Sequence, residues 1–174
     1  MTEATEAFDG AMTPPHDSYW VLPGQLLAGP YPGGPSEGAM RAALDAFRGV
    51  GVTLFVDLTE EGELAPYDHL LEGTGTRHVR MPVRDFGVPA RERARETVAL
   101  VRTALDEGEV VYVHCRGGAG RTGTIVGCLL VEQGTPPNAA IEHIARLREG
   151  LDRGEWRSPE TSEQRAFIER WQPR

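Results

Sequence analysis

Short apolar runs alternate along the chain with longer stretches in which apolar residues recur at helical spacing. The apolar runs are rich in β-branched, aromatic and leucine side chains and predict strands. These predicted strands cover residues 19–22, 25–28, 53–58 and 110–113. The helical spacing predicts helices from about residue 37 to 47 and from about residue 91 to 105. Such an alternation of strands and helices is typical of βαβ units in a parallel sheet.

A hairpin and further helices complete the pattern. Pro23 and Gly24 separate the first two strands, which predicts a hairpin at the edge of the sheet. Two more helices are expected late in the chain. One is capped by Asn138, and the other is opened by Ser158 followed by Pro159.

Length and composition fit one domain with a substantial core. The chain has 174 residues, of which 40% are hydrophobic. No internal repeat or second domain is indicated. We therefore expect a single three-layer α/β domain with a central, mostly parallel, twisted sheet of about four to five strands flanked by helices. Residues 1–17 are polar, acidic and proline-containing and are expected to be disordered, which leaves residues 18–174 as the folded domain.

Charge and residue usage exclude several functions. The net charge of −8 argues against non-specific binding to nucleic acid or to anionic membranes. All 18 basic side chains are arginine, so Schiff-base chemistry and a Walker-type lysine are excluded. The first residues lack the apolar core of a secretory signal, and the longest apolar stretch, residues 125–131, is too short to span a bilayer. We expect a monomer in the cytoplasm.

The most informative segment runs from Val110 to Thr124 and reads VVYVHCRGGAGRTGT. It starts as a strand buried on both faces and continues at helical spacing from Arg121 onward, so a loop joins strand to helix. Three glycines in this loop relax the steric limits on φ and let successive backbone N–H groups turn inward. Together with the positive end of the helix, these groups form a nest that fits a dianionic phosphate.

The side chains of this loop are suited to phosphoryl transfer. Cys115 opens the loop, where its sulfur can face the phosphorus, and Arg121 closes it, where the guanidinium fork can hold two phosphate oxygens. The hydroxyl of Thr122 is placed to donate a hydrogen bond to the sulfur, which favours the thiolate. His114 is expected to orient the loop, because a thiolate needs no base, only an acid that protonates the departing oxygen.

The loop matches the signature HCxxGxxR[ST]G and resembles the cysteine-dependent protein tyrosine phosphatases of the dual-specificity type. The matching residues are His114, Cys115, Arg116, Gly117, Gly118, Ala119, Gly120, Arg121, Thr122 and Gly123. The resemblance implies a cysteinyl-phosphate intermediate on Cys115, with Arg121 holding the transferred group in a cradle of residues 116–121. It also implies that the hydroxyl of Thr122 eases breakdown of the intermediate.

The resemblance further implies an aspartate that acts as general acid, some thirty residues before the cysteine and after a short strand. Asp85 stands at this spacing, in a loop marked by Gly87 and Pro89 that can close over a site. Asp57, at the end of the strand over 53–58, is the competing acid. It more plausibly caps or hydrogen-bonds the loop that follows it, and we rank it second.

Other residues have weaker functional interpretations. Arg116 is expected to point outward, towards an acidic substrate or solvent. Gln164 is similar to glutamines that orient water in some relatives, but an exposed or helix-packing amide is the more common role. Cys128 is interpreted as a small buried core residue rather than as a partner in a disulfide with the signature cysteine. A run of three glutamates is interpreted as solvated: Glu60, Glu61 and Glu63.

Substrate choice rests on less specific features. The loop lacks the extra basic residues with which phosphoinositide phosphatases of this superfamily hold ring phosphates, which disfavours a lipid substrate. No clear tyrosine-bearing loop deepens the pocket, which favours a shallow site for phosphotyrosine and phosphoserine or phosphothreonine. The rim is expected to include Tyr31, Tyr67 and Phe86. We expect a phosphorylated protein or a small phosphoester as substrate, phosphate, sulfate or vanadate in the loop, and no metal or cofactor.

Two other classes of function remain open from the residues. The same fold could serve as a phosphate-binding module without catalysis, although a binder has no use for a nucleophile and an acid. Sulfurtransferases of the rhodanese type also build a cysteine cradle, yet their loop is usually shorter or differently composed. A small phosphorylated metabolite is an alternative substrate for a phosphatase.

Overall fold

The computed structural model describes residues 12–174, so the predicted N-terminal segment, residues 1–17, falls mostly outside the described residues. The elements follow one another as β1 (Tyr19–Leu22), β2 (Leu26–Gly29), α1 (Glu37–Gly49), β3 (Leu54–Asp57), η1 (Asp68–Leu71), β4 (Arg77–Arg80), α2 (Arg91–Asp106), β5 (Val111–His114), α3 (Gly120–Glu132), α4 (Pro137–Leu147) and α5 (Ser162–Glu169). The predicted alternation of strands and helices is confirmed. The short 3₁₀ helix η1 was not predicted.

β5 is the central strand of a five-stranded sheet with the order β1-β2-β5-β3-β4. β2 and β3 flank it in parallel, and each places a leucine opposite Val111, Leu26 on one side and Leu54 on the other. β4 pairs parallel with β3, whereas β1 pairs antiparallel with β2, which confirms the predicted edge hairpin. All of β5 is buried, as expected for a strand covered on both faces. The loop that leaves β5 therefore starts from the middle of the sheet.

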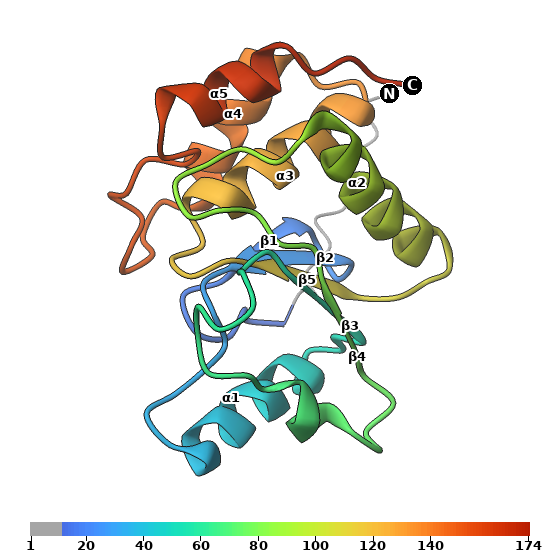
Figure 1. The fold of residues 1–174 in the computed structure, drawn as a ribbon, viewed down its shortest axis with the longest axis vertical. Helices are drawn as coiled ribbons and strands as arrows, with labels where there is room; N and C mark the ends of the chain where they lie inside the picture. The colour runs from blue at the N-terminus through green and yellow to red at the C-terminus, as the bar shows by residue number, and fades with distance from the viewer. Residues whose placement is uncertain (1–11) are drawn as a thin grey trace, which may run out of the picture.

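Two hydrophobic cores cover the two faces of the sheet (Figure 1). α1 and η1 lie on one face, where Phe47 stacks on Tyr112 with ring centroids 4.1 Å apart. α2, α3, α4 and α5 lie on the other face, with α3 as the buried centre of this layer. Gly127 of α3 allows close packing of α5, because a Cβ there would stand 2.2 Å from the side chain of Ile168. The expected three-layer α/β domain is confirmed.

The start of α4 differs from the sequence prediction. The helix begins at Pro137, with Pro136 in the N-cap position, so Asn138 already lies inside the first turn and does not cap it. Proline is well suited to the first turn, where its missing N–H has no intrahelical partner in any case. Within residues 12–174, no helix combines the length and apolar character needed to cross a membrane.

α5 begins later than predicted, because a capping box sets its start. The side chain of Thr161 accepts a hydrogen bond from the Gln164 N–H, and the side chain of Gln164 accepts one from the Thr161 N–H. The stretch over 158–160 passes beside the signature loop instead, where the Ser158 hydroxyl donates to the Ala119 carbonyl at 2.7 Å. The start of α5 is thus attached to the loop after β5.

Candidate functional site

The signature loop leaves the carboxyl end of β5 and enters α3. Cys115 lies at its start and is almost fully buried. Gly118 adopts a left-handed φ of 74°, and a Cβ there would stand 2.4 Å from the carbonyl carbon of Gly29. Conformation and space both require glycine at this position. The loop is also fixed to the end of β2, since the Tyr31 N–H donates to the Arg116 carbonyl at 3.1 Å.

The other two glycines of the loop make room rather than relax φ. A Cβ at Gly117 would stand 3.0 Å from the ring of Trp156, and a Cβ at Gly120 would stand 2.9 Å from the side-chain nitrogen of Gln164. The loop therefore packs against the segment that runs from α4 into α5. The expectation of relaxed φ holds for Gly118 alone.

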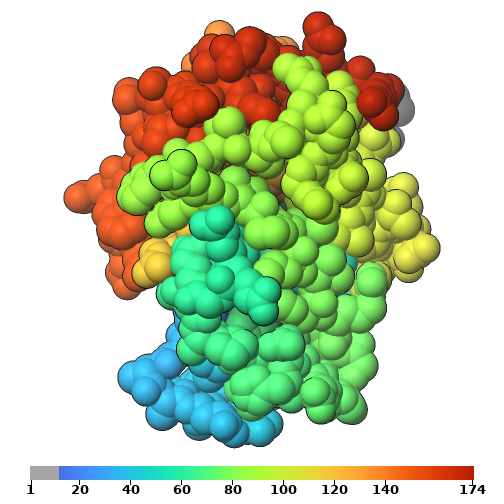
Figure 2. All heavy atoms as spheres, in the orientation of Figure 1, coloured from blue at the N-terminus to red at the C-terminus, as the bar shows by residue number. Residues whose placement is uncertain are grey.

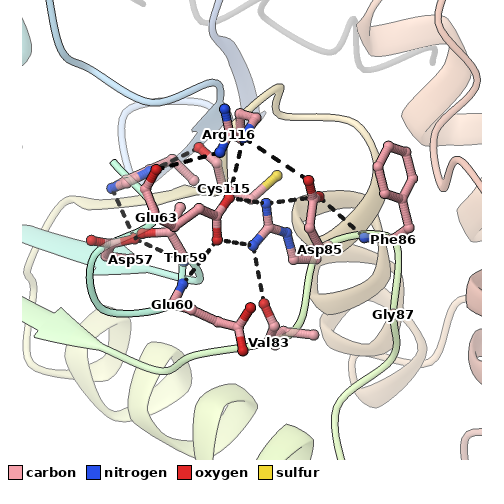
Figure 3. A network of polar contacts seen from close by, with 12 residues as sticks. Asp57, Thr59, Glu60, Glu63, Val83, Asp85, Phe86, Gly87, Cys115 and Arg116 are labelled. Carbon is pink, nitrogen blue, oxygen red and sulfur yellow. Dashed lines mark hydrogen bonds and ion pairs between the residues drawn. The ribbon is translucent and has the colours of Figure 1, made fainter. Parts of the chain in front are cut away.

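The side chain of Arg121 is only 1% exposed, and three groups from other segments hold it. Its Nη1 and Nη2 donate to the two carboxylate oxygens of Glu63 at 2.8 and 2.7 Å. Nη1 also donates to the Val83 carbonyl at 3.0 Å, and Nη2 lies 2.9 Å from Oδ1 of Asp85. Figure 3 shows Glu63, Val83 and Asp85 around one guanidinium, with the sulfur of Cys115 pointing into the same space as the Asp85 carboxylate.

These contacts divide the guanidinium into two sides. Glu63 takes the end of the fork, formed by Nη1 and Nη2. The Nε–H and the remaining Nη2 N–H form a second parallel pair of donors, the geometry that matches two oxygens of a phosphate. Among the described residues, Asp85 is the group that contacts this side. Glu63 therefore sets the orientation in which Arg121 presents its other edge to an anion.

Glu63 is the site residue that sequence interpretation missed. Its side chain is mostly buried and accepts hydrogen bonds from Arg121 and, at 3.3 Å, from Arg116, so its interpretation as solvated is wrong. The hydrogen bonds from Arg121 lower the pKa of Glu63 to about 2, against the opposing effect of burial. Glu60 and Glu61 are exposed as expected. Nothing in the local sequence distinguishes Glu63 from them, because its partner lies 58 residues later.

Asp85 lies in the loop from β4 to α2, which passes over the signature loop. Phe86 has a left-handed φ of 59°, and its N–H donates to the Asp85 carboxylate at 3.1 Å, while its ring is exposed. Arg116 points outward and lies 3.9 Å from Asp85 Oδ2. The side chain of Gln164 is fully buried and donates to the Gly87 carbonyl at 3.1 Å. Gln164 is thus a helix-packing amide that attaches the Asp85 loop to α5.

Asp57 lies buried at the end of β3 and is held from several directions. It accepts hydrogen bonds from the N–H and the hydroxyl of Thr59 at 2.9 and 2.6 Å. His78 and Arg80 approach its other oxygen at 3.1 and 3.2 Å. Burial opposes the charge, but the hydrogen bonds from His78 and Thr59 hold the pKa of Asp57 well below its usual range. The expectation that Asp57 bonds the following loop is confirmed.

His114 is fully buried directly beneath the signature loop. Its Nε2 lies 2.6 Å from the hydroxyl of Tyr67, and its Nδ1 lies 3.2 Å from the carbonyl of Cys115. A neutral imidazole that donates from Nδ1 and accepts at Nε2 satisfies both contacts. Burial lowers the pKa of His114 to about 4. Tyr67 is buried rather than at the rim, so that sequence prediction is wrong.

Thr122 and Cys128 are the remaining residues with predicted roles. Thr122 Oγ1 is buried and has no hydrogen-bond partner within residues 12–174, so the predicted hydrogen bond from Thr122 to the sulfur of Cys115 is absent from this structure. Cys128 is fully buried in the core, as predicted, and burial raises the pKa of its thiol. Figure 2 shows the gold atoms of the signature loop at the surface between the segments that follow β3, precede α2 and follow α4. A cavity of about 480 Å³ lies beside it, and Tyr31 and Arg116 line its wall.

Comparison with known proteins identifies the family of this chain. The family model described as "Swiss Army Knife protein, DSP-PTPase phosphatase domain" matches residues 15–168. The chain is 30% identical over 101 residues to phosphatidylglycerophosphate phosphatase PTPMT1 of Arabidopsis thaliana, covering 57% of this chain and 30% of that protein. It is 27% identical over 143 residues to protein tyrosine phosphatase type IVA 3 of Mus musculus, covering 80% and 76%. Against three of the curated relatives, the chain spans only about a third of their length or less.

Solved structures show the same fold. Tk-PTP in its active form superposes with a TM-score of 0.71 at 24% identity, covering 87% of this chain and 93% of that one. A TpbA variant of P. aeruginosa in complex with pTyr superposes with a TM-score of 0.67 at 16% identity, covering 93% and 91%. The family model matches residues 15–168, which are nearly all of the described residues and include the signature loop. The chain belongs to the DSP-PTPase phosphatase domain family of the Swiss Army Knife proteins.

Proposed function

We propose that this chain hydrolyses phosphomonoesters on proteins through a covalent intermediate on Cys115. The observation that carries the proposal is the convergence of Asp85, from the loop before α2, with two residues of the signature loop. Asp85 Oδ1 lies 2.9 Å from Nη2 of the buried Arg121, and Figure 3 shows the sulfur of Cys115 pointing towards the Asp85 carboxylate. A nucleophile, an anion clamp and an acid are the parts that such a reaction needs.

The reaction proceeds in two displacements at phosphorus. In the first, the Cys115 thiolate attacks, the S–P bond forms, the P–O bond to the leaving group breaks, and Asp85 gives its proton to the departing oxygen. In the second, water attacks the phosphorus, the P–S bond breaks, inorganic phosphate leaves, and the proton of the water passes to Asp85. Arg121 holds two phosphate oxygens with Nε and Nη2 in both steps, where negative charge develops. The buried Thr122 hydroxyl has no partner among the described residues, and we propose that it turns to donate to the sulfur as the sulfur departs.

The contact between Asp85 and Arg121 links substrate binding to the position of the acid. A phosphate oxygen that binds Nη2 competes with the Asp85 carboxylate for the same edge of the guanidinium. Once displaced from Arg121, the partly exposed Asp85 side chain can take up a proton from solvent and turn to the leaving oxygen as an acid. Asp57 is the weaker candidate for this acid, because its lowered pKa favours the ionised form and its oxygens are bonded to Thr59, His78 and Arg80.

The charges at the mouth favour a protein substrate over one with several phosphates. Arg116 is the second cation of the signature loop, and Glu63 already engages its side chain. PTPMT1 has been solved in complex with PI(5)P and TpbA in complex with pTyr, so ligands of both kinds bind proteins of this fold. With Arg116 occupied, no cation of the loop remains for a second phosphate, and we propose phosphotyrosine, with phosphoserine or phosphothreonine as weaker substrates.

The test is hydrolysis of para-nitrophenyl phosphate from about pH 5 to 8 without metal, comparing the wild type with Cys115→Ser. We expect turnover that survives a chelator, yields to vanadate and is lost in the variant. Rapid quenching of the wild type with substrate, followed by peptide mass spectrometry, should find phosphate on Cys115.

Other outcomes identify the alternative functions. A folded wild type that binds vanadate without turning over any aryl phosphate would establish a phosphate-binding module instead. Formation of thiocyanate from thiosulfate and cyanide, again without phosphatase activity, would establish a sulfurtransferase. Loss of turnover on addition of a chelator would contradict a thiolate mechanism.

A further inference from the structure

Trp156 is a large apolar side chain that the fold leaves 50% exposed beside the signature loop. Its ring lies against Gly117, since a Cβ at Gly117 would stand 3.0 Å from ring carbon Cζ3. Gly117 is two residues after Cys115, so the ring lies beside the loop that carries this cysteine. A half-exposed indole beside this loop is available to contact a bound substrate.

A dedicated set of hydrogen bonds holds the backbone beneath this ring. The buried Arg148 donates from Nη2 to the Arg153 carbonyl at 2.9 Å and from Nη1 to the Trp156 carbonyl. From the other side, the Asp17 carboxylate accepts from the N–H groups of Asp152 and Arg153 at 2.7 and 3.2 Å. The buried guanidinium of Arg148 thus holds two carbonyls of this loop. The backbone that carries the Trp156 ring is therefore held in place without a substrate.

Arg153 and Trp156 together form a wall beside the signature loop. Its guanidinium carbon stands 5.3 Å from the centroid of the Trp156 ring, within the range of a cation–π contact. Arg153 also lines the cavity of about 480 Å³ that Tyr31 and Arg116 border. The wall thus runs from the signature loop into a hollow large enough for the chain on either side of a phosphorylated residue.

We infer that Trp156 is a specificity-determining residue that stacks on the flat leaving group of an aryl phosphate and so selects phosphotyrosine over phosphoserine. The inference rests on the proposed phosphatase function. A phenyl ring on the phosphate oxygen presents a face to the indole, whereas the methylene of phosphoserine presents none. Offset stacking of two aromatic rings contributes about 0.5 to 1.5 kcal/mol beyond the area buried. At 1.36 kcal/mol per tenfold, this corresponds to about 2- to 12-fold in kcat/KM.

The test compares two substrates that share a peptide and differ in the phosphorylated residue. The kcat/KM values for phosphotyrosine and phosphoserine versions are measured for the wild type, Trp156→Ala, Trp156→Leu and Trp156→Phe. We expect the ratio of tyrosine to serine activity to fall by about 2- to 12-fold in the alanine and leucine variants and to stay close to wild type in the phenylalanine variant. Leucine keeps an apolar side chain, so it separates stacking from burial.

The readouts separate this inference from the proposed function. An equal loss on both substrates, or higher activity after Trp156→Ala, would contradict the specificity role while leaving the phosphatase intact. A wild type inactive on every phosphoester would contradict the proposed phosphatase function. Calorimetric measurement of the binding of the two peptides would then test directly whether Trp156 favours phosphotyrosine. Inhibition constants for inorganic phosphate should be the same in all four proteins, because phosphate has no ring to stack.

Discussion

Replacing Glu63 by glutamine removes one charge from the centre of the site and changes almost nothing in size. Glu63 gives each of two carboxylate oxygens to Arg121, at 2.8 and 2.7 Å. Glutamine keeps one oxygen and turns an N–H₂ group towards a guanidinium N–H that then has no acceptor. Hydrogen bonds to charged groups contribute about 1.5 to 3 kcal/mol each, and a buried donor without a partner costs about as much. We expect Glu63→Gln to lower the free energy of unfolding by about 3 kcal/mol.

The same substitution should also reduce activity, because Glu63 fixes the orientation of the Arg121 guanidinium. Without the second hydrogen bond from Glu63, the guanidinium can rotate, and its Nε and Nη2 edge no longer faces the phosphate in one fixed orientation. Misplacement of a binding group by about 1 Å can cost about 100-fold in rate, so we expect kcat/KM for para-nitrophenyl phosphate to fall by about 10- to 100-fold. Inhibition by inorganic phosphate should weaken in parallel. Urea denaturation and steady-state kinetics measure the two effects on the same samples.

Glu61→Gln is the matched control, because Glu61 is exposed and two residues away. It makes the same change of charge in the same segment and should stay within about 0.5 kcal/mol of the wild type in stability. A Glu63→Gln variant with the kinetics of this control would refute the reasoning that Glu63 orients Arg121. Equal losses in both variants would show that net charge near the mouth, not the bidentate contact, sets the activity.

Three further outcomes are expected. Asp85→Asn should lower turnover of a phenyl phosphate by about 10²- to 10⁴-fold, with a smaller loss on a better leaving group, and near wild-type turnover would remove Asp85 as the acid. Gly118→Ala should cost more than about 2 kcal/mol in urea denaturation, because its Cβ would meet Gly29, whereas Gly73→Ala has a similar φ of 72° in open space and should cost about 1 kcal/mol. Since burial lowers the pKa of His114 to about 4, the unfolded chain takes up this proton first as the pH falls. Stability should therefore drop by up to about 3 kcal/mol between about pH 6.5 and 4, and a His114→Asn variant with the same slope would contradict this assignment.

The sheet could be predicted because its strands stand out in the sequence as short apolar runs. β5 reads as a continuous apolar run, and burial on both faces is what such a run requires. The hairpin of β1 and β2 followed from Pro23 and Gly24. η1 carried no such signal, since four residues are too short for a periodicity. The starts of α4 and α5 were misplaced because several residues nearby could begin a helix, and Pro136 with Pro137 and the capping box of Thr161 and Gln164 set the observed starts.

The site could be predicted only where chemistry and spacing act together. The signature loop is continuous in sequence, and Asp85 stands at the spacing that the family resemblance implies for an acid. Glu63 and Tyr67 gave no local signal, because each acquires its role from a partner about 50 residues later. An acidic residue on a polar segment and an aromatic residue near a turn look alike whether they end up buried or exposed. Contacts across the sheet, absent from any local window, decided both.

The hydrogen bond from Gln164 to the Gly87 carbonyl connects the last helix to the loop that carries Asp85. The Gln164 end of this bond is anchored, since the capping box fixes Gln164 in α5 and α5 packs on α3. The entropy of ordering the Asp85 loop is therefore lost during folding rather than on binding of a substrate. A substitution that loosens α5 would leave the Asp85 loop less ordered, so part of the ordering entropy would be lost during the reaction. Such a substitution would lower activity although it touches no reacting atom.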